Sequence, residues 1–148
     1  NWAGSNVYTV YDPSYNYYYT PATYEKPASV LHMLRLLVGD DTFFQILQTY
    51  FQTYYNQNVV TSDFQEICEQ VGGLDLDQFF QQWIFEPGLP YLDYAYFLSV
   101  DENNPQIITY LKTSSDTNTE FYISAPFQIN YAVGSDSVLV ESAPDEAV

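Results

Sequence analysis

The apolar positions of this chain follow two periods. Between residues 28 and 84 they recur at spacings of three and four, as in α-helices, and from Leu92 onwards they alternate with polar residues, as in β-strands. The most apolar segment, 28–38, has almost no polar face and predicts a helix that is buried on nearly all sides. Pro27 suits the first position of that helix, because its missing N–H has no intrahelical partner there. The helix is therefore predicted to begin at about Pro27, and Tyr24 lies just before it, where its side chain can face a cleft.

Three more helices are predicted downstream of this one. Gly39 is a suitable C-terminal stop for the first helix, Gly72-Gly73 for the third, and residues 87–90 end the helical half. The second helix should have about four turns. The caps that the spacing predicts are Asp40 or Asp41 for the second helix, Ser62 with Gln65 as a capping box for the third, and Asp75 with Gln78 for the fourth.

The remaining residues predict four or five strands. They are 92–100, 106–112, one or two strands within 120–133 that are interrupted at Pro126, and 137–141. A complete sandwich usually has about seven strands, so this half is predicted to be partial or to pair with another segment. The fold class is therefore α+β, with a helical part at 1–90 and part of an antiparallel β-sandwich at 91–148.

The first 23 residues are rich in tyrosine and have neither period. The tyrosines in question are Tyr8, Tyr11, Tyr15, Tyr17, Tyr18 and Tyr19. One interpretation is a loop or short strand laid across a larger body; the other is a tyrosine-lined ligand groove, since tyrosine combines a large apolar ring with a polar tip. A segment this aromatic is expected to be covered. The chain starts without methionine at Asn1, which we interpret as a cut.

Composition narrows the functional classes. The 148 residues are 47% hydrophobic, enough for a packed core, and carry a formal charge of -16, which disfavours nucleic acid and anionic membrane surfaces as partners. The apolar run at 28–38 is too short to span a bilayer, so no membrane span is predicted. Cys68 is the single cysteine and lies on a helical apolar pattern, so we expect a buried, inert thiol.

Few residues offer catalytic chemistry of their own. The sequence has no HExxH motif, and its only histidine, His32, lies in the apolar helix, where a core histidine is expected and not a metal ligand. No serine or cysteine has a base to activate it. Carboxylate groups at Asp40-Asp41, Asp75 with Asp77, and Asp101-Glu102 could attract calcium, but none has the EF-hand spacing and two are more simply helix caps.

One segment resembles a known family. Tyr24-Glu25-Lys26, followed after one residue by 28–35 and then by Val38-Gly39-Asp40, is similar to a characteristic segment of the aminopeptidase N-like zinc peptidases, gluzincins with a thermolysin-like catalytic domain. The resemblance covers residues 19–90 and continues in the family's order through Phe43, Leu47, Tyr50, 61–64, 74–76, 79–80, 82–84 and 88–90. It implies that 1–90 is the end of the α-helical C-terminal lobe of the catalytic domain and that 91–148 belongs to the sandwich that follows.

The same resemblance implies roles for two tyrosines. Tyr24 would donate a hydrogen bond to the oxyanion formed when zinc-activated water attacks a peptide carbonyl, a task that suits a neutral phenol. Tyr19 matches a second family tyrosine near the active site. Pro27 stands where the family usually has glycine, so the backbone around Tyr24 is the point at which the match departs.

The family's zinc ligands, two histidines of one helix and a glutamate of the next, lie upstream of this segment. The chain is therefore predicted to be a fragment of a zinc metallopeptidase, to bind no zinc itself and to be inactive alone. Its predicted partners are the missing N-terminal part of the catalytic domain and, in the parent, a peptide substrate. The resemblance to the family and the acidic, cysteine-poor composition suggest a secreted or periplasmic location.

Two other classes stay open. The chain could be a non-catalytic interaction module that binds a partner through its tyrosine-rich surface, or a dead homologue that has lost its zinc ligands.

Overall fold

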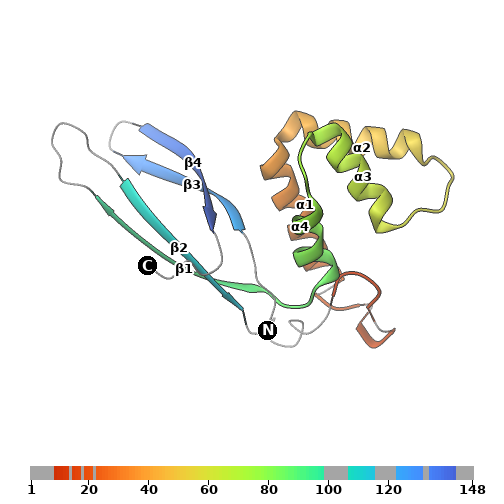
Figure 1. Cartoon of the computed structure of the whole chain (residues 1–148), viewed down its shortest axis with the longest axis horizontal. Coiled ribbons are helices and arrows are strands. Elements are labelled where there is room, and N and C mark those ends of the chain that lie inside the picture. Colours follow the sequence, from red (N-terminus) through yellow and green to blue (C-terminus); the bar gives the residue numbers. More distant parts are fainter. Residues whose placement is uncertain are drawn as a thin grey trace. The chain divides into compact units, whose positions relative to one another are not determined.

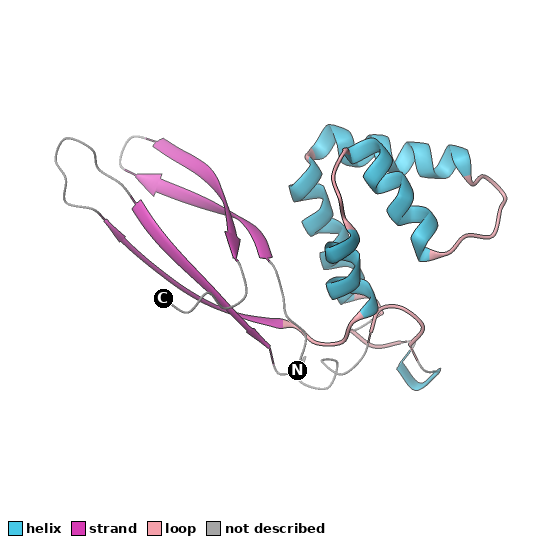
Figure 2. Ribbon diagram, in the orientation of Figure 1, coloured by secondary structure: helices cyan, strands magenta, loops and turns pink. Residues whose placement is uncertain are grey.

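A computed structural model describes residues 9–13, 15–17, 19–21, 23–98, 107–115, 123–131 and 134–142. The chain divides into two compact units, residues 1–88 and 89–148. The described helices belong to the first unit and the described strands to the second (Figure 2). The structure is thus an α+β mixture, as the two periods predicted.

The α-helices of the helical unit are labelled in Figure 1. After a short 3-10 helix, η2 (Tyr15–Tyr17), come α1 (Glu25–Val38), α2 (Asp40–Thr53), α3 (Thr61–Gly72), α4 (Asp77–Phe80) and the π-helix η3 (Gln81–Phe85). We call residues 1–23 the tyrosine-rich leader. Its described residues have turns and η2 but no strand, which favours the loop interpretation. Tyr8 and Tyr18 lie outside the described residues.

The core of this unit forms where the apolar faces of α1 to α4 meet. Ile46 and Cys68 are fully buried, and Leu34 and Leu76 nearly so. The other buried members of the cluster are Phe43, Ile67 and Phe80. The prediction that Cys68 is buried is confirmed, and its burial raises the pKa of the thiol to about 12.

The prediction that the first helix is buried on nearly all sides is wrong. Leu31 and Leu36 are 41% and 48% exposed, and His32 is exposed as well. The buried residues of α1 are Lys26, Val30 and Leu34, which recur every four residues and so form a single stripe. The helix begins at Glu25, two residues before the predicted start, because the backbone carbonyl of Tyr24 already accepts a hydrogen bond from Ala28 N at 3.1 Å.

The first junction between helices differs from the predicted cap. Gly39 ends α1 as predicted, at φ +83°, but it also occupies the N-cap position of α2 in place of Asp40 or Asp41. The Asp40 carboxylate instead accepts two hydrogen bonds from Arg35, at 2.8 and 2.7 Å. This bidentate pair lowers the pKa of Asp40 and raises that of Arg35, and Arg35 also lies over the Phe44 ring.

Both predicted capping boxes are also replaced. Val60 is the N-cap of α3, and its N–H donates to the Asp63 carboxylate at 2.8 Å. Asp63 therefore supplies the capping hydrogen bond that the spacing predicted for Ser62 and Gln65. At α4 the N-cap is Leu76, and Asp75 accepts a hydrogen bond from Asp77 N at 3.0 Å without Gln78. Gly73, in the left-handed conformation, ends α3 as predicted.

The predicted fourth helix divides into two parts. Its first four residues are α-helical, and the chain then widens into the five-residue π-helix η3, closed by Glu86 N donating to the Gln81 carbonyl at 2.9 Å. Trp83, within η3, is buried.

The second unit has four described strands in two antiparallel pairs. β1 (Pro90–Leu98) pairs with β2 (Ile107–Ser115), and β3 (Ile123–Tyr131) pairs with β4 (Gly134–Ser142). β3 runs through Pro126, opposite Leu139, so the predicted interruption there is wrong. β2 also contacts β4, but the described strands form two separate two-stranded sheets, and assignment of the unit to a sandwich remains a prediction.

Candidate functional site

The two tyrosines singled out by the sequence lie together at the start of α1. The rings of Tyr19 and Tyr24 are nearly parallel, with 20° between their planes and 6.5 Å between their centroids. Both are exposed, Tyr19 to 87% and Tyr24 to 58%. The structure thus places Tyr24 where the sequence predicted, just before the helix, with its phenol accessible to another molecule.

A hydrogen-bonded turn carries Tyr24 into the helix. Thr23 N and Thr23 Oγ1 both donate to the Thr20 carbonyl, at 3.0 and 2.9 Å. Lys26 N then donates to the Pro21 carbonyl at 2.9 Å. Pro27 is accommodated without a cis peptide bond, at the third position of α1, where a missing N–H leaves no helical bond unmade. The departure from the family's glycine therefore fits a regular helix start.

Lys26 is a residue at this site that the sequence interpretation missed. Its side chain is 4% exposed, and Nζ donates to the backbone carbonyls of Gly88 at 3.2 Å and Glu86 at 3.4 Å. Burial lowers its pKa from 10.5 to about 8. A signal was present in the sequence, because Lys26 lies four residues before Val30 and eight before Leu34 and so shares their buried stripe.

The leader contacts the same end of the helical unit. Tyr11 N donates to the Ile84 carbonyl at 3.0 Å, and the Tyr11 ring lies 5.1 Å from that of Phe85. Residues of the leader, of the turn before α1 and of the segment after η3 are therefore linked through described contacts within one unit.

The residues of this chain do not fit the zinc site of a gluzincin. His32 is the only histidine in the sequence, and it lies on the exposed side of α1, so the prediction of a core histidine is wrong. A zinc site needs at least three protein ligands, and the two histidines and glutamate that the resemblance implies are not available here.

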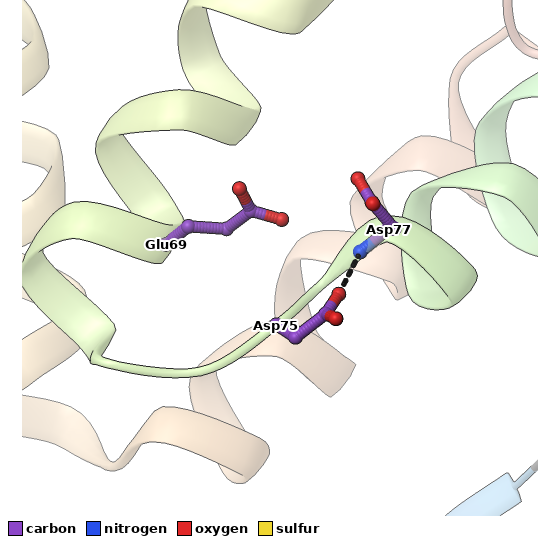
Figure 3. A group of neighbouring side chains, drawn as sticks. All are labelled: Glu69, Asp75 and Asp77. Atoms are coloured by element: carbon purple, nitrogen blue, oxygen red, sulfur yellow. Dashed lines mark hydrogen bonds between the residues drawn. The ribbon is translucent and has the colours of Figure 1, made fainter.

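Among the described residues, one group of carboxylates lies close enough to resemble a metal site. Ligand atoms of Glu69, Asp75 and Asp77 are within 4.8 Å of one another, at the junction of α3 and α4 (Figure 3). Each already accepts a protein hydrogen bond: Glu69 from Leu76 N at 3.0 Å, Asp75 from Asp77 N, and Asp77 from the Gln65 amide at 2.7 Å. The three carboxylates are therefore accounted for by structural hydrogen bonds, which hold the loop between α3 and α4 and the start of α4.

Comparison with known proteins places the chain in a family. Residues 5–83 match the peptidase family M1 domain, so the chain belongs to peptidase family M1. This confirms the resemblance seen at the Tyr24-Glu25-Lys26 segment.

The individual relatives are aminopeptidases. The chain is 30% identical over 100 residues to aminopeptidase N of Escherichia coli K12, a match that covers 68% of this chain and 11% of that protein. It is 33% identical over 67 residues to aminopeptidase N of Lactococcus lactis, covering 45% of this chain and 8% of that protein. The chain thus spans about a tenth of the curated relatives it matches.

A solved aminopeptidase structure is also similar to this chain. The crystal structure of Legionella pneumophila aminopeptidase A in complex with aspartic acid matches 84% of this chain and 15% of its own chain, with a TM-score of 0.66 and 26% identity. The fold is thus that of a segment of an aminopeptidase.

Proposed function

We propose that this chain is the segment of a zinc aminopeptidase that carries the oxyanion-stabilising tyrosine, Tyr24. The single observation that carries the proposal is the position of Tyr24: an accessible phenol at the N-terminus of α1, within the part of the chain that matches peptidase family M1. Tyr19, whose ring lies against that of Tyr24, is the second residue of the proposed site.

The chemistry proposed for Tyr24 is hydrogen-bond donation. As a nucleophile attacks a peptide carbonyl, negative charge builds up on the oxygen, and a donor already in place stabilises that charge more than it stabilises the substrate. A phenol can do this without giving up its proton. The attacking water and the metal that activates it belong, in this proposal, to residues outside this chain, so the isolated chain is inactive.

The remaining partners of the chain are proposed on the same basis. Its matches cover 11% and 8% of two aminopeptidases, so we propose that the rest of the catalytic domain packs against this segment. The exposed rings of Tyr15 and Tyr19, together with Leu31 and Leu36, are apolar surface suited to such a contact. The proposed substrate is a peptide, as the names of the relatives suggest.

The first test is the coding sequence upstream of Asn1. A His-Glu-x-x-His motif followed by a glutamate, over roughly a hundred residues, supports a zinc peptidase. A reading frame that begins near Asn1, or substituted ligands, contradicts the enzyme proposal and favours an interaction module or a dead homologue.

The decisive test is kinetic and uses the full-length peptidase. Tyr24→Phe removes only the hydroxyl and should lower kcat about a hundredfold, equivalent to roughly 3 kcal/mol, with KM little changed. Tyr55→Phe is the matched control, since Tyr55 is 62% exposed just after α2 and its described ring contact is with Phe51. Equal kcat values for the Tyr24→Phe variant and the wild type would show that Tyr24 is not the oxyanion donor.

A further inference from the structure

Lys26 is an unusual residue for this chain because it is a buried cation that pairs with no described carboxylate. The sequence has nineteen acidic residues and three basic ones, yet the Lys26 ammonium contacts backbone carbonyls. Among the described residues the ion pair found is that of Arg35 with Asp40. Buried charges are normally paired, because removing them from water costs several kcal/mol per ion. Burial without a counter-charge lowers the pKa of Lys26.

The two carbonyls that Lys26 contacts are held in place by the end of η3. Glu86 is fixed twice, by its N–H bond to the Gln81 carbonyl and by the Gln81 amide, which donates to its carboxylate at 3.0 Å. Gly88 is buried and has a φ of +102°, a conformation that side chains rarely adopt. The cradle formed by the Glu86 and Gly88 carbonyls therefore depends on glycine at position 88.

The backbone of Lys26 belongs to the turn that presents Tyr24. Its N–H donates to the Pro21 carbonyl, and it lies two residues after Tyr24 in the first turn of α1. Tyr24 itself is more than half exposed, and its described ring contact is with Tyr19, which is even more exposed. The core therefore does not fix the phenol, and its direction depends on the described backbone of residues 20–21 and 23–26.

Lys26 thus joins this turn to a segment 60 residues further along the chain. Its backbone closes the turn, and its side chain attaches the same turn to the carbonyls at 86 and 88. An apolar side chain of similar length would fill the space without the cost of burying a charge. The hydrogen-bonding end of the side chain therefore needs a purpose beyond filling the core.

We propose that Lys26 is a positioning residue for Tyr24: by binding the Glu86 and Gly88 carbonyls, it fixes the first turn of α1 and hence the direction of the Tyr24 hydroxyl. This inference rests on the proposed function of Tyr24. Lys26 does not contact substrate in this proposal and acts only through the tyrosine.

A double-mutant cycle in the full-length peptidase tests the proposal. Lys26→Met should lower kcat roughly ten- to a hundredfold, the range for a misplaced catalytic group, while KM changes by less than about threefold. In the Tyr24→Phe background the same substitution should cost less than about twofold, because the hydroxyl that Lys26 positions is already gone. Lys112→Met, which removes an exposed lysine on β2, is the matched control and should leave kcat unchanged.

The same losses in both backgrounds would assign Lys26 a merely structural role and overturn the proposal, as would an unchanged kcat in Lys26→Met. Gly88→Ala provides an independent variant that disturbs the carbonyl cradle without altering α1. It should reproduce the kcat loss of Lys26→Met and the same lack of additivity with Tyr24→Phe. If Lys26→Met does not fold, Gly88→Ala alone decides the outcome.

A second measurement separates this proposal from that of Tyr24 as oxyanion donor. In the 148-residue chain, labelled Tyr24 ring resonances should shift in Lys26→Met and Gly88→Ala but not in Lys112→Met. If Tyr24→Phe leaves kcat unchanged, the oxyanion role fails, while the ring resonances still show whether Lys26 fixes Tyr24. Unchanged ring resonances in the first two variants would overturn the positioning role whatever the kinetics show.

Discussion

At the residue scale, the molecule is organised around a contrast between Tyr24 and Lys26. The tyrosine is exposed and the lysine two positions later is buried, although the usual preference of the two residue types is the reverse. Helix geometry explains this, because Lys26 lies on the stripe of Val30 and Leu34, while Tyr24 precedes the helix.

The buried lysine predicts a pH dependence of stability. Its pKa is about 8 in the folded chain and 10.5 ordinarily, so between these values the unfolded chain binds more protons than the folded one. The contribution of Lys26 to the free energy of unfolding should therefore rise as pH increases from about 8 to 10.5, and below pH 8 the full cost of burying the charge is present.

Urea unfolding of the wild type and of Lys26→Met checks this prediction. The difference in unfolding free energy between the two should shift in favour of the wild type over that pH range. Titration of Cys68, Tyr50 and Tyr54, whose pKa values are raised by burial, opposes this rise equally in both proteins and is removed by the comparison. A difference that is constant with pH would show that Lys26 keeps its ordinary pKa.

At the element scale, the caps differ most from the sequence prediction. Spacing alone indicated Ser62 with Gln65 for α3, whereas the chain uses Asp63 one position on, with its carboxylate bonded to Val60 N. Several polar residues stand at the start of the helix, and which of them becomes the cap depends on where the preceding loop enters.

The two possible caps of α3, Asp63 and the Ser62–Gln65 capping box, predict different effects of mutation. Asp63→Ala should destabilise the chain by about 1 kcal/mol, the usual cost of losing a cap, because Val60 N loses its acceptor. Ser62→Ala should change stability by less than about 0.5 kcal/mol. Thermal or urea unfolding of both variants measures the two values, and a larger loss in Ser62→Ala would restore the capping box that the sequence predicted.

Much of the helical unit could be predicted from sequence because its apolar residues keep one period over long segments. Gly39 and Gly73 mark helix ends for a local reason, their positive φ, and so were found correctly. The π-helix could not be predicted, because widening the helix by one residue at 81–85 leaves the apolar pattern of the fourth helix nearly unchanged. Long-range features need knowledge of the fold.

The candidate site shows the same division. The position of Tyr24 just before a helix could be predicted from its short-range context, because the apolar run at 28–38 begins a few residues after it. The partners of Lys26 could not, because the Glu86 and Gly88 carbonyls are 60 and 62 residues away and are backbone groups without a sequence signature. The apolar neighbours on both sides of His32 predict burial, whereas His32 lies on the exposed side of α1.

At the scale of the whole molecule, the excess of acidic residues dominates. The net charge is -16, Arg35 pairs with Asp40, and Lys26 is buried. Repulsion between surface carboxylates should therefore oppose folding at low ionic strength.

Among the described residues no helix is both long and apolar enough to cross a membrane.

Adding sodium chloride should raise the unfolding temperature of the chain. The Debye length falls from about 30 Å at 0.01 M to about 8 Å at 0.15 M salt, so repulsion between exposed carboxylates is increasingly screened. A variant with Glu66→Gln and Asp93→Asn, which removes two exposed charges, should show a weaker salt dependence. Differential scanning calorimetry measures both, and an unfolding temperature that falls with salt would contradict the prediction.

The burial of Cys68 gives the molecule a built-in reporter. The sequence has one cysteine, it is inaccessible in α3, and its raised pKa keeps almost none of it as reactive thiolate at neutral pH. A thiol reagent can therefore modify the chain only when the helical unit opens. The rate of that reaction therefore measures how often the core around α3 opens. The measurement reports on one site per chain and needs no added label.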